Sequence, residues 1–305
     1  MSRRIGIDLG GTKVLGVVLD DGEVAQKAKR KTPTTGGPDG VVATIAEVVD
    51  DLGGAKGGRI GLGAPGVVDV AAGVVSRAPN LAGWDEPFAL AEAVAEATEA
   101  EVRIDNDVNV AALAERELGA ARDVDDVLAV FVGTGVGGGL ILGGEVRRGP
   151  FGVAGEIGHT IVHPGGRTCG CGGAGHLEAY AGRAGLEAEA RRLAVQGEST
   201  LLVSLAEEKR MTSSVFSKAL ERGDPIAARL IDEAVEALGI AVANAAAVLD
   251  LALVVVGGGL AARLGPSFVG RVEQAVRANL FAATPLRVVP AALGDEAGAI
   301  GAALL

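Results

Sequence analysis

The sequence predicts an α/β protein built from two related halves. Strand-like apolar runs alternate with segments of helical periodicity along the 305 residues, an order typical of α/β domains. A glycine-rich segment also recurs. Shifted by 122 positions, residues 11–24 align with residues 133–146 without a gap and with seven identities. Convergent hairpin chemistry would explain the recurrence, whereas a duplicated domain would also fix the architecture.

Each half is predicted to open with a β-hairpin that carries a glycine tip. RIGIDLGG (residues 4–11) reads as a strand entering a turn, and TKVLGVVLDDGEV (12–24) as the returning strand; VLAVFVGTGVGGGLILGGEV (127–146) repeats the pattern. Glycines let a ligand approach the main chain closely, and successive N–H groups with a Thr hydroxyl form an anion site. Two such tips facing each other would hold a polyphosphate. Neither tip is a Walker A loop, and no G-x-G-x-x-G stands in a Rossmann context.

Polar side chains mark a strand-to-helix junction in EVRIDNDVNVAALAERELG (101–119). Asp105, Asn106, Asp107 and Asn109 lie where a short strand gives way to a helical pattern. Helix capping explains one of them, since Asp and Asn are preferred caps. Several polar groups at the carboxyl end of a strand are more than a cap requires, and α/β folds place ligands there.

Phosphoryl transfer needs anchored phosphates, a metal ion and a base for the acceptor hydroxyl. Asp107 as the base and the two Gly-Thr tips as phosphate clamps meet two of these needs. Asp8 ends the first strand beside its tip, where a carboxylate would meet Mg²⁺ bound to the phosphates. A Ser-His-Asp hydrolase is excluded because all three histidines lie in one later loop. The pattern therefore favours a kinase.

All cysteines and histidines of the chain lie in GEIGHTIVHPGGRTCGCGGAGHLE (155–178). The four candidate ligands have the spacing H-x9-C-x-C-x4-H: His159, Cys169, Cys171 and His176. Two thiolates and two imidazoles suit tetrahedral Zn²⁺, whereas a disulfide between the cysteines would close a strained, very small ring. We predict a structural zinc with His163 outside its ligand set. Residues 159–176 are called the Cys/His loop below.

Two further features concern the surroundings of these motifs. Glu156 and Glu178 flank the Cys/His loop, so that folding around a metal would bring two carboxylates together. A third glycine tip, VVVGGGL (254–260), follows a strongly apolar run and precedes a helix. It would lie under an adenosine in a nucleotide site, and a plain strand-to-helix turn explains it equally well. A long helical pattern precedes this run, over residues 225–249.

Composition narrows the class of protein. A net charge of -11 and a pI near 4.9 argue against a nucleic-acid partner, and 3% aromatic residues argue against base-stacking surfaces. The apolar runs are shorter than the about 20 residues that span a bilayer. We expect no signal peptide at MSRRIGIDLGG. The expected protein is a cytoplasmic enzyme without membrane partners.

Together the motifs resemble the ROK family of sugar kinases and sugar-responsive repressors, within the actin/hexokinase-like ATPase fold. They occur in this order along nearly the whole chain: IGIDLGGTK, GAPGVVD, PNLAGW, DNDVN, GTGVGGG, GEIGH and CGCGGAGHLE. The resemblance implies two α/β lobes, duplicated ribonuclease-H-like domains, around a cleft. We expect the small lobe to comprise residues 1–107 with 293–305, and the large lobe residues 108–292.

Residue by residue, the resemblance implies Asp107 as general base and Asp8 as the carboxylate facing Mg²⁺. The sugar would be bound by Gly66, Asn80, Asn106, Asp107, Glu156, His159 and Glu178. ATP would be bound by Asp8, Gly10, Gly11, Thr12, Lys13, Gly133, Thr134, Gly135, Gly257, Gly258 and Gly259. His159 would serve zinc with one ring nitrogen and sugar with the other. The family usually has a third cysteine where this chain has His176, so a Cys2His2 zinc site is expected.

The resemblance implies ATP-dependent phosphorylation of a hexose at its 6-hydroxyl, with D-glucose as the expected acceptor. Alternatives are a kinase of N-acetylmannosamine, N-acetylglucosamine, fructose or allose, and polyphosphate in place of ATP. A catalytically idle sugar sensor and an actin-like filament protein are alternatives of other classes. The phosphate motifs with Asp107 argue against the first, and the Cys/His loop argues against the second. A DNA-binding repressor is not expected, because the phosphate motif begins at residue 5. The family suggests a homodimer or homotetramer.

Overall fold

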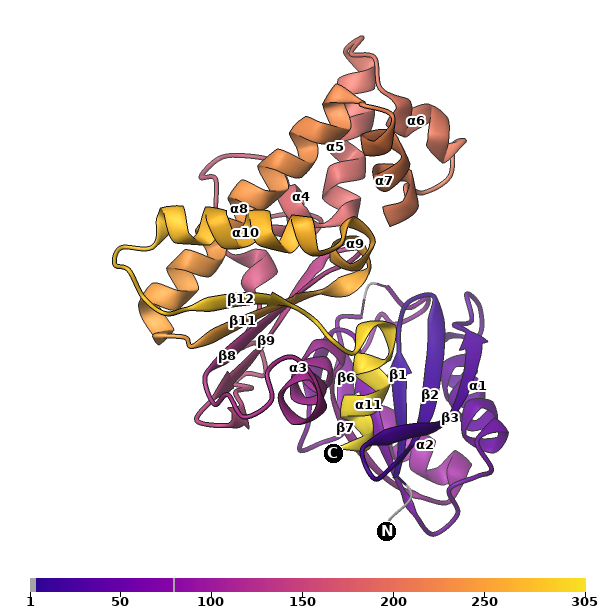
Figure 1. Cartoon of the computed structure of the whole chain (residues 1–305). Coiled ribbons are helices and arrows are strands. Elements are labelled where there is room, and N and C mark those ends of the chain that lie inside the picture. Colours follow the sequence, from indigo (N-terminus) through magenta and orange to yellow (C-terminus); the bar gives the residue numbers. More distant parts are fainter. Residues whose placement is uncertain (1–3, 79) are drawn as a thin grey trace.

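Two five-stranded sheets of the same topology form the framework of the molecule (Figure 1). The structure, a computed structural model, describes residues 4–78 and 80–305; Pro79, which opens the PNLAGW motif, lies outside them. The strand orders are β3-β2-β1-β4-β7 and β10-β9-β8-β11-β12. In each sheet three consecutive antiparallel strands are extended by two parallel ones. The recurrence in the sequence thus corresponds to a repeated topology.

The first sheet and its helices have the following bounds: β1 Arg4–Leu9, β2 Lys13–Asp20, β3 Glu23–Lys31, α1 Gly37–Asp51, β4 Arg59–Ala64, α2 Leu90–Thr98, β7 Glu101–Asn106, α3 Asp107–Leu118 and α11 Ala297–Ala303. Two short strands, β5 Val67–Asp69 and β6 Val74–Ser76, pair separately.

The second sheet and its helices have these bounds: β8 Val127–Val132, β9 Val136–Leu142, β10 Glu145–Val146, α4 Glu178–Ala181, α5 Arg183–Val195, α6 Leu201–Ala206, α7 Ser213–Glu221, α8 Pro225–Leu249, β11 Leu253–Gly257, α9 Gly258–Leu264, α10 Pro266–Asn279 and β12 Arg287–Pro290. Two short 3-10 turns are η1 Ile157–His159 and η2 Gly294–Glu296.

The same two-residue turn follows the second strand in both halves. Asp21 and Gly22 have φ of 50° and 83°, and Gly143 and Gly144 have φ of 59° and 79°. Turns with φ > 0 at both positions match the right-handed twist of the paired strands, and residues without a bulky β-branch fit them best. This shared turn accounts for the recurrence of Gly-Glu-Val at the end of the aligned segments.

Helix α3 lies between the two sheets and packs against both. Ala111 and Ala114 join a core with β2 and α11, whereas Ala112 joins a core with β8 and β11. Figure 1 shows α3 and α11 side by side in this position. The small alanine side chains let both layers approach the helix closely. The first residue of this helix is Asp107, so the candidate base lies where the two halves meet.

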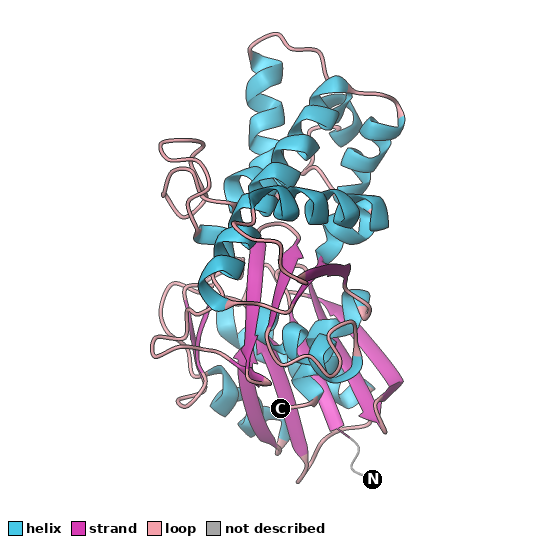
Figure 2. Ribbon diagram, turned by 60° about the vertical axis from the view of Figure 1, so that its left-hand side comes forward, coloured by secondary structure: helices cyan, strands magenta, loops and turns pink. Residues whose placement is uncertain are grey.

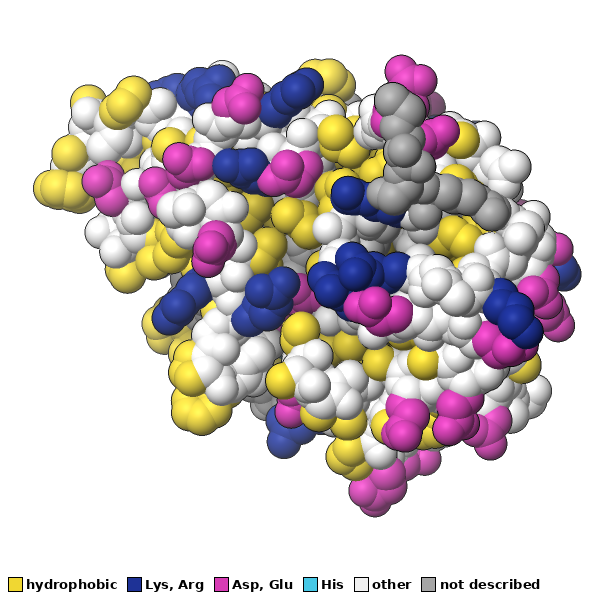
Figure 3. All heavy atoms as spheres, turned by 90° about the horizontal axis from the view of Figure 1, so that it is seen from below, with side chains coloured by type: hydrophobic (Ala, Val, Ile, Leu, Met, Phe, Trp, Pro, Cys, Tyr) yellow, Lys and Arg dark blue, Asp and Glu magenta, His cyan; other side chains and the backbone are white. Residues whose placement is uncertain are grey.

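The far faces of the sheets carry the larger cores. Helices α1 and α2 cover the first sheet, and α4 to α10 cover the second, so that helices gather at one end of the molecule in Figure 2. On the face shown in Figure 3, acidic and basic side chains are interspersed. Among the helices of residues 4–78 and 80–305, none combines the length and apolarity needed to cross a membrane.

The buried carboxylate of Glu115 on α3 holds the segment in which the chain returns to the first sheet. Its side chain is fully buried. It accepts hydrogen bonds from the N–H groups of Ala292 and Leu293, at 3.1 and 2.9 Å, and from Ala120 at 2.8 Å. Residues 292 and 293 follow β12 directly, and η2 and α11 come next. One side chain therefore fixes the return crossing to the helix that begins with Asp107.

Replacing Glu115 by Ala is expected to destabilise the fold by about 2 kcal/mol, because three partly buried N–H donors lose their buried acceptor. The free energy of unfolding in urea measures this loss. Glu117→Ala is the matched control on the same helix. Its carboxylate pairs with Arg116 near the surface, and such pairs contribute less than about 1 kcal/mol. Equal stability of the two variants would contradict the assignment.

Candidate active site

A cavity of about 570 Å³ lies between the two sheets. Asp8 at the end of β1, Asp107 at the start of α3, and Lys13 at the start of β2 face it from one side. The opposite wall comes from β8, β11, α9 and α10: Phe131, Val256, Gly257, Gly258, Ala261, Ala262, Gly265, Pro266 and Val269. The cavity thus has a charged end and an apolar end lined by small residues, as a phosphorylated ligand with an apolar ring system requires.

The two aspartates at the charged end have raised pKa values. Burial and the negative charge of Asp8 raise the pKa of the Asp107 carboxyl from 3.8 to about 7, with a smaller contribution from Glu156. Burial raises the pKa of Asp8 to about 6; the cation of Lys13 opposes this rise and Asp295 adds to it. Carboxyl groups that hold protons near neutral pH can act as acid–base groups. A cation bound beside them would stabilise their ionised form.

The polar residues around Asp107 have different structural roles. Asn106 is the N-cap of α3: its Oδ1 accepts from the N–H of Val108 and of Asn109, and its Nδ2 donates to the carbonyl of Gly66 at 3.0 Å. Two of the residues predicted to bind the sugar, Asn106 and Gly66, are therefore hydrogen-bonded to each other. The capping interpretation is confirmed for Asn106, and Asp107 is the member of this segment that lines the cavity with Val108.

Asp105 forms a pair that the sequence did not predict. It is 2% exposed, and its Oδ2 accepts from Nε and Nη2 of Arg148 at 2.7 and 2.6 Å. Its Oδ1 accepts from the backbone of Asn106 and from the side chain of Asn109. Arg148 lies just after β10, so these two bonds to one carboxylate oxygen join the two halves two residues before Asp107.

The two hairpin tips lie outside the wall of the cavity, although Lys13 next to the first tip lines it. In the first tip, Gly10 N–H donates to Lys13 O at 2.9 Å, and a Cβ on Gly11 would lie 2.9 Å from the carbonyl oxygen of Asn80. In the second, Thr134 Oγ1 accepts from Arg183 Nη2 at 2.7 Å. Thr12, Gly133 and Gly135, which were predicted to bind ATP, therefore do not line this cavity.

The glycines at 257–259 form the junction of β11 and α9, as the apolar run predicts. Gly257 and Gly258 line the cavity. Gly258 has φ of 87°, and a Cβ there would lie 2.5 Å from the backbone of Val132. Only glycine fits this position, because the backbone conformation and the space both exclude a side chain. Gly259 is not part of the lining.

The Cys/His loop brings its four predicted ligands together. One ligand atom from each of these residues lies within 4.8 Å of all the others: His159, Cys169, Cys171 and His176. Sγ of Cys169 is 3.9 Å from Nδ1 of His159, and Sγ of Cys171 is 3.2 Å from Nδ1 of His176. Tetrahedral Zn²⁺ separates sulfur and nitrogen ligands by about 3.6 Å, so the four residues fit this ion. His163 stands apart, with its ring 4.7 Å from that of Tyr180.

The two glutamates that flank the Cys/His loop relate it to both halves of the site. Nε2 of His159 faces the carboxylate of Glu156 at 3.9 Å, and Glu156 is close enough to raise the pKa of Asp107. Glu178 lies 3.5 Å from Sγ of Cys169 through Oε1 and accepts from the N–H of Val136 through Oε2. The loop is therefore joined through Glu178 to the second hairpin, and the charge of Glu156, which faces His159, acts on Asp107.

Sequence reasoning missed part of the cavity wall. Asp295 lines the cavity and pairs with Lys13 at 3.3 Å, and Gly265 and Pro266 contribute at the start of α10. The Gly-Pro pair is a recognisable helix-start signal, whereas the partner of Lys13 lies 282 residues away in the chain. Such a distant pairing has no local signal.

Comparison with known proteins shows the family to which the chain belongs. A family model described as "ROK family" matches residues 4–305. The chain belongs to the ROK family. Among curated ROK relatives, a glucokinase of Thermotoga maritima is 34% identical over 98% of this chain and 95% of its own length. An N-acetylmannosamine kinase of Escherichia coli O157:H7 is 32% identical over 99% of this chain and 97% of its own length.

Two solved ROK structures resemble the whole chain. A ROK hexokinase from Thermus thermophilus has a TM-score of 0.83 and 37% identity, covering 99% of this chain and 97% of its own. A ROK family glucokinase from Streptomyces griseus, in complex with glucose and AMPPNP, has a TM-score of 0.84 and 34% identity, covering 99% and 98%. The predicted two-lobed actin/hexokinase-like fold is confirmed.

Proposed function

We propose that this ROK chain is an ATP-dependent sugar kinase that phosphorylates D-glucose at its 6-hydroxyl. The observation that carries the proposal is the position of Asp107, a carboxylate of raised pKa at the cavity between the lobes. The glucokinase relatives of nearly full length supply the acceptor, and the complex of the Streptomyces griseus protein with glucose and AMPPNP supplies the nucleotide class. The small lobe is proposed to span residues 1–107 and 293–305, and the large lobe residues 108–292.

In the proposed reaction Asp107 accepts the proton of the sugar 6-hydroxyl while that oxygen bonds to the γ-phosphorus of ATP. The bond from the γ-phosphorus to the β,γ-bridging oxygen breaks, and ADP leaves. The apolar wall around Gly258 and Ala261 would receive the nucleoside, and the hairpin tips with Lys13 the phosphates. Mg²⁺ beside Asp8 would neutralise charge on the phosphates. Asn80, Glu156, His159 and Glu178 are proposed to bind sugar hydroxyls, together with Gly66 and Asn106.

The four residues of the Cys/His loop are proposed to hold a structural Zn²⁺. Burial raises the pKa of the Cys169 thiol to about 11, so that a thiolate at this position requires a cation beside it. With four protein ligands the ion would have no open position for a reacting water. It would hold His159 and Glu178 in place on the sugar side.

The acceptor is tested by an ADP-release assay across a panel of sugars with Mg-ATP. We expect kcat/KM for D-glucose to exceed that for fructose, allose, N-acetylglucosamine and N-acetylmannosamine. The N-acetylmannosamine kinase relative makes N-acetylmannosamine the second candidate. A higher kcat/KM for that sugar would make it the acceptor in place of glucose. Turnover of none of these sugars would contradict the proposed function. The same assay with polyphosphate instead of ATP tests the donor.

Activity is expected to rise with pH up to about 7, because Asp107 accepts a proton only when it is ionised. Below that pH, kcat/KM for the sugar should fall by about tenfold per unit. Asp8 and Glu156 both face this carboxyl and contribute negative charge. Steady-state assays between about pH 5.5 and 8.5 measure the profile. A flat profile down to about pH 5.5 would contradict a base of raised pKa.

A further inference from the structure

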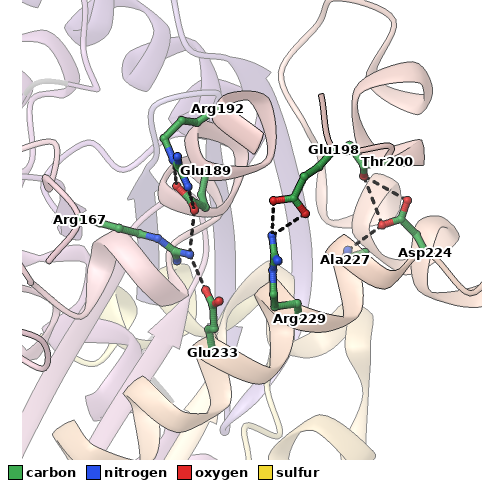
Figure 4. A network of polar contacts seen from close by, with 9 residues as sticks. All are labelled: Arg167, Glu189, Arg192, Glu198, Thr200, Asp224, Ala227, Arg229 and Glu233. Atoms are coloured by element: carbon green, nitrogen blue, oxygen red, sulfur yellow. Dashed lines mark hydrogen bonds and ion pairs between the residues drawn. The ribbon is translucent and has the colours of Figure 1, made fainter. Parts of the chain in front are cut away.

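Arg167 of the Cys/His loop sends its side chain out of the loop and between two helices (Figure 4). Its Nη2 contacts Glu189 of α5 at 3.3 Å and also pairs with Glu233 of α8. The guanidinium lies 4.8 Å from the centre of the Tyr180 ring. The side chain of Arg167 is 20% exposed and that of Glu189 is 11% exposed, so this contact is shielded from water on most sides.

The main chain of Arg167 is fixed as well. Its N–H donates to the hydroxyl oxygen of Tyr180 at 2.9 Å, and its carbonyl accepts from Gly175 N–H at 2.8 Å. Cys169 follows two residues later, and Tyr180 follows Glu178 by two residues. The residue therefore ties both ends of the segment that carries the metal ligands to the helices behind it.

Two carboxylates gather around this one cation. Hydrogen bonding from Arg192 and the charge of Arg167 lower the pKa of Glu189. Arg192 also contacts Glu189 at 2.7 Å, but both residues belong to α5, three positions apart (Figure 4). Charged hydrogen bonds with little exposure to water are stronger and more directional than surface pairs. Arg167 thus holds the loop, whereas Arg192 only pairs within its own helix.

We propose that Arg167 is a positioning residue that fixes the Cys/His loop on helices α5 and α8, and thereby sets the metal ligands and the sugar-side carboxylates before any ligand binds. This inference rests on the proposed sugar site and zinc site. It predicts a loss of sugar affinity and a faster loss of zinc when the anchor is removed, with the nucleotide cavity unchanged. An ordinary stabilising ion pair would lower stability alone.

The test compares Arg167→Met with Arg192→Met in the full chain loaded with zinc. Zinc release to a colorimetric chelator is followed over time, and KM values for glucose and ATP are determined separately. We expect Arg167→Met to release zinc at least about tenfold faster, as groups that support metal ligands commonly do. Its KM for glucose should rise by about fivefold or more, while its KM for ATP stays within about twofold. Arg192→Met should match the unchanged protein in all three.

Arg167→Lys keeps the charge but lacks the planar fork, and it should give an intermediate zinc release rate. If Arg167→Met does not fold, the comparison of Arg167→Lys with Arg192→Met decides. Equal zinc release and equal glucose KM in the Arg167 and Arg192 variants would overturn the proposal. Zinc release is measured without any sugar, so it tests the anchor even if the chain phosphorylates a sugar other than glucose.

Discussion

Asp107→Asn is expected to lower kcat by about 10²-fold or more while glucose affinity changes only a few fold. The amide keeps the size of the carboxylate and its hydrogen bond from Val108 N–H, but it has no basic oxygen to accept the proton of the 6-hydroxyl. Single-turnover assays at saturating Mg-ATP measure the chemical step, and equilibrium binding of glucose measures the affinity.

The same substitution should stabilise the fold above neutral pH. The pKa of Asp107 is 3.8 as an ordinary value and about 7 in the folded chain, so the folded state binds the proton more tightly than the unfolded state does. Its contribution to stability is therefore full below about pH 4 and is lost as pH rises to about 7. Asn carries no such dependence, and thermal unfolding at pH 8 should show a higher Tm for the variant. Near-normal turnover would remove Asp107 from the role of base, and an unchanged Tm at pH 8 would contradict its raised pKa.

Cys169→Ser is expected to abolish zinc binding and to raise the KM for glucose by about tenfold or more. The thiol is buried, 3% exposed, and lies against both His159 and Glu178, so loss of the ion releases residues on the sugar side. The nucleotide wall is made by other elements, and the KM for ATP should stay within about twofold. Metal content by mass spectrometry and separate KM determinations check both expectations.

Two variants in the same loop make this result specific. His163→Ala should keep one zinc per chain, because its ring lies tilted against that of Tyr180, outside the ligand set. His176→Cys should also keep the zinc, since a thiolate can replace the imidazole as a ligand. Full metal content in Cys169→Ser, or loss of metal in His163→Ala, would show that the ligand set is wrong.

Features with a local cause could be predicted from the sequence. Helix α8 begins at Pro225 and ends at Leu249 as its periodicity predicts. Pro suits the first helical turn, and the side chain of Asp224 accepts from Ala227 N–H as an N-cap. The repeated hairpins could also be predicted from the sequence, because their turns depend on a few adjacent residues. That the four proposed zinc ligands lie close together could be predicted because the chain places all its cysteines and histidines in one loop.

Features with a distant cause could not be predicted. Asp105 pairs with a residue 43 positions away, and Arg167 with one 66 positions away. Glu115 bonds residues 177 and 178 positions away. On the sequence these are ordinary charged residues of a helix, a strand and a loop. The roles of Asp105 and Glu115 follow from how the two sheets enclose α3, and that of Arg167 from how the Cys/His loop packs on α5 and α8. Sequence periodicity shows neither arrangement. The same holds for the apolar wall of the cavity, whose small residues come from four separate elements.

The outer strands of the two sheets also bear on how the chain behaves at high concentration. β3 is an edge strand, and an edge offers free N–H and C=O groups to other molecules. Lys27, Lys29 and Lys31 alternate along it with Arg30 between them, so that two such edges would repel each other. In the second sheet β12 is an edge strand. It ends with Pro290, which has no N–H to donate. Intermolecular strand pairing is thus opposed by positive charge at the β3 edge and by a missing N–H donor at the β12 edge.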